Sequence, residues 1–159
     1  MQSDPFAGAS CGFTLTPEAA VHVELAALAY HDTAAAEKSL LEAIAAAPKC
    51  LGTYFSLYKF YFYKRRLADA ERVALRALEV AAAQAGFDHN WTRLSPSSAA
   101  WSNVEGPQHF YLFTLKALAF IRLRSGQTGS ALMVLAKLFE LDPDDGVGGS
   151  VIRDLAESM

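Results

Sequence analysis

Histidines, cysteines and carboxylates are the side chains of this sequence that could do chemistry, and their spacing argues against a metal site. The four histidines are spread along the chain: His22, His31, His89 and His109. None of them stands four residues from another histidine or from a cysteine, as paired zinc ligands on a helix would. We interpret Cys11 and Cys50 as free thiols in a reducing cytoplasm, although their spacing is compatible with a disulfide.

Motifs for nucleophilic or phosphate chemistry are also missing from the sequence. The chain contains no GxxxxGK[ST] or GxGxxG loop and no GxSxG nucleophile turn. The glycine-rich segment 146–149 is too short to cradle a phosphate, and Asp144 and Asp145 stand at an expected turn, where carboxylates usually face solvent. The sequence therefore predicts a protein without enzymatic activity, metal or cofactor.

Composition predicts one helical domain. The chain has 159 residues, of which 52% are hydrophobic and 19% charged, and these values exclude disorder as the main state. Ala and Leu far outnumber Val and Ile, which favours an all-α fold. The net charge of -3 argues against nucleic-acid binding. Because we find neither a signal peptide nor an apolar run of about 18 residues, we expect a cytoplasmic protein that does not bind membranes.

Similar helix-opening segments recur along the chain. Ala36 and Ala70 stand 34 residues apart in TAAAEKSLLEA and LADAERVALRA, and Ala131 stands in a third such context. Pro48 and Pro143 each follow an expected helix end. A repeat of this length is typical of stacked helix pairs, and the chain resembles the tetratricopeptide repeat (TPR) family.

The resemblance implies an all-α solenoid of about three helix pairs, in which small residues let the paired helices approach closely and a last helix caps the array. An ordinary helical bundle is the alternative. The predicted parts are a flexible tail at residues 1–15 and a single domain at 16–159, which comprises repeats at 17–50, 51–84 and 112–145, an inserted loop at 85–111 and a capping helix at 150–159.

One face of the predicted array carries aromatic and basic side chains. In the TPR family, certain positions on the first helix of each pair line a concave groove, which implies a partner-binding surface here. The implied residues are Phe55, Lys59, Phe62, Tyr63, Phe113, Lys116, Phe120 and Arg124. Residues 51–84 carry six basic and three acidic residues, so we expect a protein or peptide partner with acidic charge. Burial of these aromatic rings within the chain and self-association into a homodimer are the alternatives.

The loop at 85–111 contains both tryptophans of the chain, Trp91 and Trp101. Long loops in compact domains are often functional, so the two rings are candidates for closing over the groove and contributing to binding. In the alternatives, they fill gaps between repeats or form the roof of a small-molecule pocket.

These features together predict a non-catalytic adaptor or an assembly chaperone that binds a partner segment. The segments LYKFYFYKRRL and FYLFTLKALAFIRLRSG resemble small repeat proteins among bacterial nitrogen-fixation accessory proteins. That resemblance implies a partner in the assembly or protection of nitrogenase. The alternatives are a small-molecule-binding protein or enzyme with a pocket under the loop, and a self-associating structural protein.

Overall fold

The computed structural model describes Phe6 and residues 13–159, and these residues form α-helices and one short 3-10 helix without any strand. The prediction of an all-α, repeat-like fold is confirmed. The elements in chain order are α1 (Pro17–Leu28), α2 (Thr33–Ala46), α3 (Leu51–Tyr63), α4 (Leu67–Ala85), η2 (Trp91–Arg93), α5 (Pro107–Arg124), α6 (Thr128–Leu141) and α7 (Gly149–Glu157).

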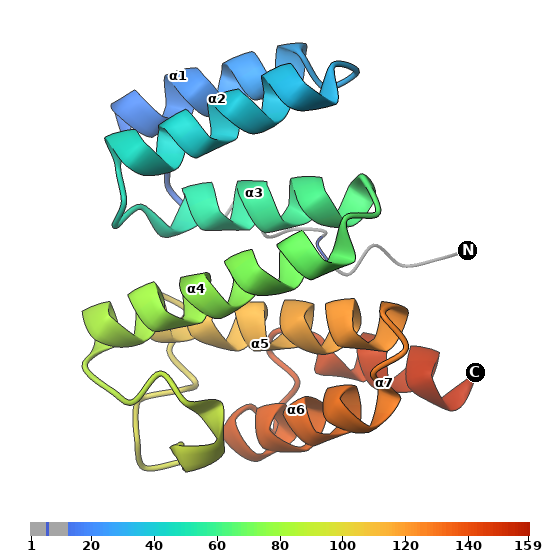
Figure 1. Ribbon diagram of the computed structural model, residues 1–159. Coiled ribbons are helices and arrows are strands. Elements are labelled where there is room, and N and C mark those ends of the chain that lie inside the picture. The colour runs from blue at the N-terminus through green and yellow to red at the C-terminus, as the bar shows by residue number, and fades with distance from the viewer. Residues whose placement is uncertain (1–5, 7–12) are drawn as a thin grey trace.

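The helices form three antiparallel pairs, which follow one another from α1 and α2 at one end to α5 and α6 at the other (Figure 1). Short turns join the two helices of each pair. At the start of α1, the Thr16 hydroxyl accepts a hydrogen bond from the Ala19 amide at 3.3 Å, and Pro17 occupies the first helical turn. Asp32 caps α2 in the same way through the Ala35 amide at 3.1 Å.

Alanines at the helix contacts allow the close pairing that the repeat pattern implied. Ala36, Ala70 and Ala131, the three residues that marked the repeat, have no exposed surface. Because the methyl side chain of alanine is small, it lets two helix axes lie close together. These alanines therefore explain how α2, α4 and α6 pack against their neighbours.

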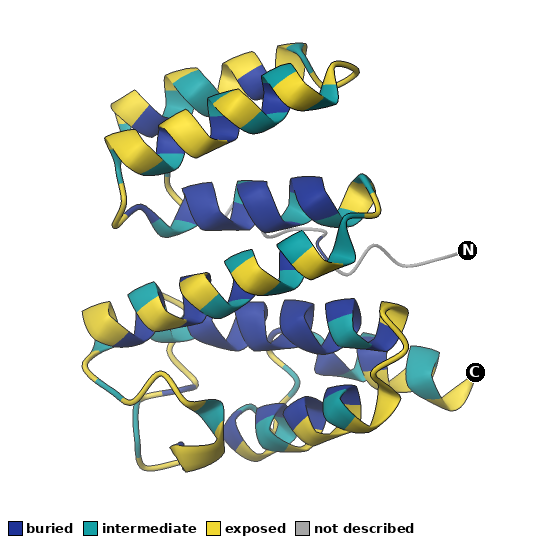
Figure 2. Cartoon of the chain, in the orientation of Figure 1, coloured by how far each residue is buried: buried dark blue, intermediate teal, exposed yellow. Residues whose placement is uncertain are grey.

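Helix α5 is the centre of the molecule. Nearly all of its residues from Phe110 to Leu123 are buried (Figure 2), because α3, α4, α6 and α7 all contact it. A helix that is apolar on every side needs such cover.

The third helix pair and the loop before it differ from their predicted bounds. Helix α5 begins at Pro107, so the connection runs over residues 86–106, whereas the prediction placed the loop at 85–111 and the repeat at 112–145. Proline fits the first helical turn because its missing N–H has no partner to lose there. The last helix, predicted at 150–159, is α7 and packs on α5 and α6.

The predicted tail, residues 1–15, lies outside the described residues except for Phe6 and residues 13–15. Phe6 is only 1% exposed. The Phe6 ring therefore packs against the helices.

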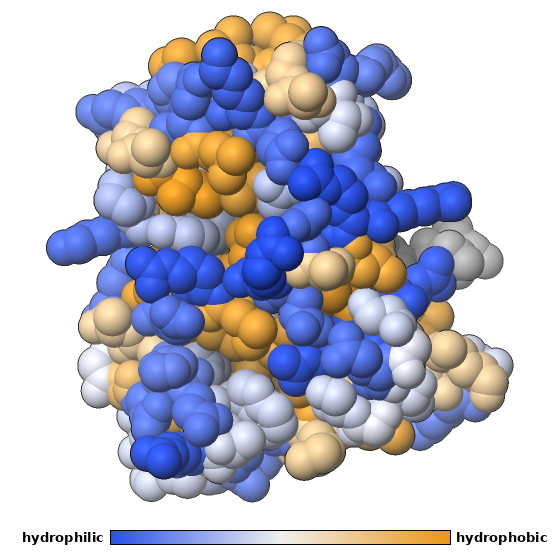
Figure 3. Space-filling view, viewed as in Figure 1, coloured by the Kyte–Doolittle hydropathy of each residue, from blue (hydrophilic) through white to orange (hydrophobic). Residues whose placement is uncertain are grey.

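The outer face of α1 is apolar at the end of the array away from α7. Val21, Leu25 and Leu28 repeat at helical spacing and are 57%, 48% and 81% exposed. Apolar surface is visible at this end of the molecule in Figure 3. No helix among the described residues is both long and apolar enough to cross a bilayer.

Candidate functional site

The first helices of the second and third pairs, α3 and α5, bring four of the predicted residues together as two aromatic pairs. Phe55 packs against Phe113 with ring centroids 5.7 Å apart, and Phe62 packs against Phe120 at 4.7 Å. The partners on each helix are seven residues apart, which is close to two helical turns, so both pairs lie along the same face. Phe55, Phe113 and Phe120 are only 4%, 5% and 6% exposed, so these rings are covered within the chain, and we call the cluster the α3–α5 groove after the binding surface that the sequence implied.

Phe6 occupies one end of the α3–α5 groove. Its ring lies 5.2 Å from Phe62 and 6.0 Å from Phe120. Three further ring contacts, at 5.8–6.3 Å, surround it: Phe55, Tyr58 and Tyr63. Most of these contacts are edge-to-face, the arrangement that aromatic pairs favour.

Phe13 covers the other end of the groove. Its ring packs edge-to-face on Phe110 at 4.8 Å, Phe113 at 5.4 Å and Phe55 at 5.7 Å. The sequence pattern did not identify Phe6 or Phe13 as part of the site. The one available signal was that both are aromatic residues in a segment otherwise rich in small and polar residues, MQSDPFAGASCGF.

Basic side chains accompany the aromatic pairs. Lys59 Nζ lies 5.5 Å from the centroid of Phe55, and Lys116 Nζ lies 4.3 Å from that of Phe113. Such cation–π contacts partly compensate the loss of water around a charge. Lys116 is buried, Lys59 is half-buried, and Arg124 is exposed at the end of α5. Tyr63, the last predicted residue of the set, is 43% exposed.

A curated protein of Azotobacter chroococcum mcd 1 is similar to this chain. It is described as an uncharacterized 19.8 kDa protein in the nifW 5′ region, and it is 34% identical over 122 residues, which are 76% of this chain and 68% of that protein. The chain belongs to the family of this 19.8 kDa protein. The relative agrees with the predicted resemblance to nitrogen-fixation accessory proteins. No family model matches the chain, including that of the TPR, and no solved structure matches it.

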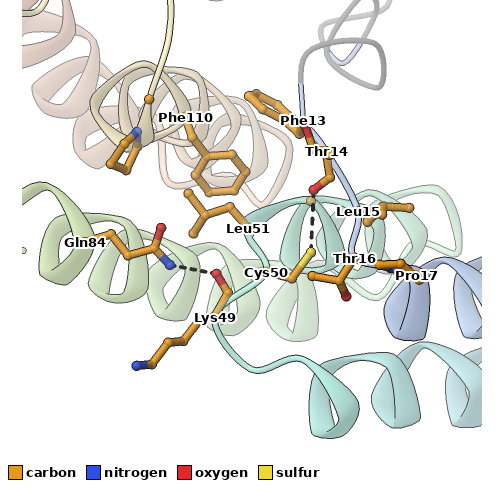
Figure 4. Close-up of a pocket in the computed structure, with 13 residues that line it drawn as sticks. Phe13, Thr14, Leu15, Thr16, Pro17, Lys49, Cys50, Leu51, Gln84 and Phe110 are labelled. Carbon is orange, nitrogen blue, oxygen red and sulfur yellow. Dashed lines mark hydrogen bonds between the residues drawn. The ribbon is translucent and has the colours of Figure 1, made fainter.

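In this member of the 19.8 kDa protein family, residues 13–16 run across the start of α3. Cys50 Sγ donates a hydrogen bond to the Thr14 carbonyl at 3.6 Å (Figure 4). A Cβ on Gly52 would lie 2.9 Å from Leu15 Cδ2 and 3.1 Å from the Phe13 carbonyl oxygen. Only glycine therefore lets this segment approach α3 so closely.

An open pocket of about 550 Å³ lies beside this crossing. Residues 13–17, the turn before α3 and Phe110 line it, and on one side Gln84 Nε2 donates to the Lys49 carbonyl at 2.7 Å (Figure 4). Its lining is mostly apolar and is continuous with the Phe13 end of the groove.

A polar network ties the first two helix pairs together. Glu37 Oε2 on α2 accepts from the Tyr61 hydroxyl at 2.6 Å and from Arg66 at 2.9 Å, and Arg66 Nε donates to Asp69 at 2.8 Å. The hydrogen bond from Arg66, aided by that from Tyr61, holds the pKa of Glu37 below its ordinary value. Arg66 likewise lowers the pKa of Asp69, and burial together with the Glu37 carboxylate raises the pKa of Tyr61.

The tryptophans lie in the loop between α4 and α5, and Trp101 is buried there. Its Nε1 donates to the Ser95 carbonyl at 2.9 Å, and its ring packs on Phe87 and Tyr111. The Tyr111 hydroxyl donates to the His89 carbonyl at 2.7 Å. Trp91 is half-buried. None of the ring partners of Trp101 belongs to the predicted groove residues.

The histidines and cysteines do not assemble into a site within Phe6 and residues 13–159. No three His, Cys, Asp or Glu side chains of this part cluster as metal ligands would. Cys50 is a buried free thiol, and Cys11 lies outside the described residues. Burial lowers the pKa of His109, an effect that Asp142 opposes and Lys116 reinforces.

Proposed function

We propose that this protein is a non-catalytic adaptor or assembly accessory protein in nitrogen fixation, and that it binds a partner segment along the α3–α5 groove. The observation that carries the proposal is the double aromatic pair, Phe55–Phe113 and Phe62–Phe120, an apolar track between two helices that the chain's own Phe6 and Phe13 cover. Tracks of this kind accept the side chains of a docked peptide as anchors.

The similarity to the nifW-region protein supports the link to nitrogen fixation, because that relative is described by its place beside a nitrogen-fixation gene. The stacked antiparallel helix pairs support the TPR-like character of the array. In a TPR-like array, the first helices of successive pairs form the binding surface, and here these are α3 and α5.

The charges indicate the chemistry of the partner segment. Lys59 and Arg124 place positive charge near the aromatic pairs, at the middle and the end of the groove, and Lys116 adds a third cation beside Phe113. A segment with aromatic or large apolar anchors and acidic flanking residues fits this arrangement, since opposite charges steer association and fix register.

Affinity capture with groove variants tests this function. Tagged wild-type chain, Phe62→Ala and Phe120→Ala are used as baits in extracts of the source cells grown on dinitrogen. We expect one specific protein to be retained by the wild type and reduced at least about tenfold with either variant, because hot-spot truncations cost about 2 kcal/mol or more.

The matched control is Phe87→Ala. Like Phe62, Phe87 is half-buried in an aromatic cluster, but its ring contacts Trp101 and Tyr111 outside the groove. This variant should retain the partner. Circular dichroism checks that all baits keep their helices. Equal capture by the wild type and both groove variants would contradict the proposal.

A further inference from the structure

We propose that Phe6 is a built-in competitor for the α3–α5 groove, so that a partner must displace it in order to dock. This inference rests on the proposed function and adds the regulation of the same site. It assigns to the Phe62–Phe120 end of the groove a subsite for one aromatic side chain, which the chain itself fills when no partner is present.

The contacts of Phe6 are those of a bound anchor. Its ring is 1% exposed and has five aromatic neighbours on two different helices. Four of those neighbours belong to the surface that the sequence implied for partner binding: Phe55, Phe62, Tyr63 and Phe120. A phenylalanine that is remote in sequence from α3 and α5 thus takes the position expected for a partner's side chain.

Contacts along residues 13–16 hold this part of the chain against α3. At the Phe13 end, the Cys50–Thr14 hydrogen bond and the close approach to Gly52 fix the chain against α3. Residue 13 leads directly into this crossing and then into the Thr16 cap of α1. Phe6 lies seven positions earlier in the sequence, and its ring contacts with α3 and α5 are interactions that a competing aromatic side chain would replace.

Tethering makes Phe6 an effective competitor even if its own affinity is modest. A ligand joined to its site by a short linker has an effective concentration on the order of millimolar. A free segment must exceed that competition, so an aromatic-bearing partner binds the wild type more weakly than it binds a chain without the Phe6 ring. The exposed Arg124 and Tyr63 lie at this end of the groove and offer contacts that an acidic, aromatic partner gains in addition.

The test uses a probe taken from the chain itself, a fluorescein-labelled peptide of residues 1–10, MQSDPFAGAS. Fluorescence anisotropy measures its binding to full-length wild type, Phe6→Ala and the control Phe87→Ala. We expect Phe6→Ala to bind the peptide at least about tenfold more tightly than the wild type and the control do, because only this variant vacates the subsite. A peptide with Phe6→Ala should bind all three chains weakly and equally.

Three results would overturn the inference. The first is that Phe6→Ala binds the peptide no better than the wild type does. The second is loss of the helical circular dichroism signal in Phe6→Ala, which would make Phe6 part of the core. The third is a wild-type dimer in light scattering that Phe6→Ala abolishes, since Phe6 would then fill the groove of a second copy.

The capture experiment separates this inference from the proposed function. Capture that depends on Phe62 and Phe120 but does not rise with Phe6→Ala leaves the function standing and contradicts the competitor role. Tight peptide binding by Phe6→Ala without any groove-dependent capture shows an aromatic subsite that Phe6 fills, but it contradicts the partner-binding function and with it the competition for a partner.

Discussion

Among the aromatic residues of α3, the tyrosines differ from the phenylalanines in the hydrogen bonds that their hydroxyls make. Tyr58 and Tyr61 face neighbouring helices of the array: the Tyr58 hydroxyl lies 3.3 Å from Thr114 Oγ1 on α5, and the Tyr61 hydroxyl donates to Glu37 on α2. Phe55 and Phe62 instead form the groove pairs. The tyrosine hydroxyls therefore join the helix pairs, while Phe55 and Phe62 pack against the Phe6 ring.

The Glu37 carboxylate should make the free energy of unfolding depend on pH in the acid range. Its pKa is lowered in the folded protein by the hydrogen bonds from Arg66 and Tyr61. Its contribution is therefore complete above the ordinary pKa of 4.5 and is lost as the pH falls through the lower, folded value. We expect Glu37→Gln to lower the free energy of unfolding by about 1 kcal/mol near neutral pH and by less at about pH 3.

Urea denaturation at both pH values measures this difference. Glu79→Gln is the matched control, since Glu79 forms a single exposed ion pair with Arg76, and such pairs contribute little. Equal losses at the two pH values for Glu37→Gln would contradict the role of the charged network.

At the element scale, the crossing of residues 13–16 over α3 depends on Gly52. An added Cβ there meets Leu15 and two backbone carbonyl oxygens at 2.9–3.1 Å, and backbone cannot yield as a flexible side chain can. We expect Gly52→Ala to destabilise the chain by about 1–3 kcal/mol and to loosen the Phe13 end of the groove. Hydrogen exchange should become faster at the amides of residues 13–16.

Gly129 provides the control for this prediction. It lies in the first turn of α6, and nothing stands within 4 Å of a Cβ added there. Gly129→Ala should leave stability unchanged or raise it slightly, because alanine is the better helix former. A Gly52→Ala chain with wild-type exchange at residues 13–16 would show that the segment does not depend on this close approach.

Sequence patterns predicted the elements better than the packing of the segments between them. The alanine repeat identified the helix pairs because it reflects close contact between helices. The start of α5 was misplaced because Pro107 was assigned to the loop, although a proline also fits the first turn of a helix. The position of Phe6 could not be predicted, since it depends on contacts with residues about 50 and 110 positions later in the chain.

The same contrast holds for the candidate site. The positions that line the groove in the TPR family predicted Phe55, Phe62, Phe113 and Phe120 as site residues. In the structure these rings form pairs between α3 and α5. The sequence left open whether such rings are covered within the chain, by a second copy or by a partner. Phe6 and Phe13 cover these rings from within the chain. Binding of a partner and formation of a homodimer stay predictions.

At the scale of the whole molecule, the two ends of the array differ. Helix α7 covers α5 and α6 at one end, whereas α1 at the other end leaves Val21, Leu25 and Leu28 exposed. Between them, the α3–α5 groove is the surface where aromatic side chains, cations and the N-terminal segment meet. We therefore propose that a partner binds in the middle of the array, in competition with Phe6.

Site-specific photo-crosslinking in living cells tests whether a partner binds at the groove. A benzoylphenylalanine at position 63 replaces the partly exposed Tyr63 at the groove, and one at position 132 replaces the exposed Leu132 on α6 as the control. In cells grown on dinitrogen, we expect position 63 to give one discrete cross-linked protein that becomes more abundant with Phe6→Ala, and position 132 to give none. A partner that cross-links from position 132 and not from position 63 would contradict the account.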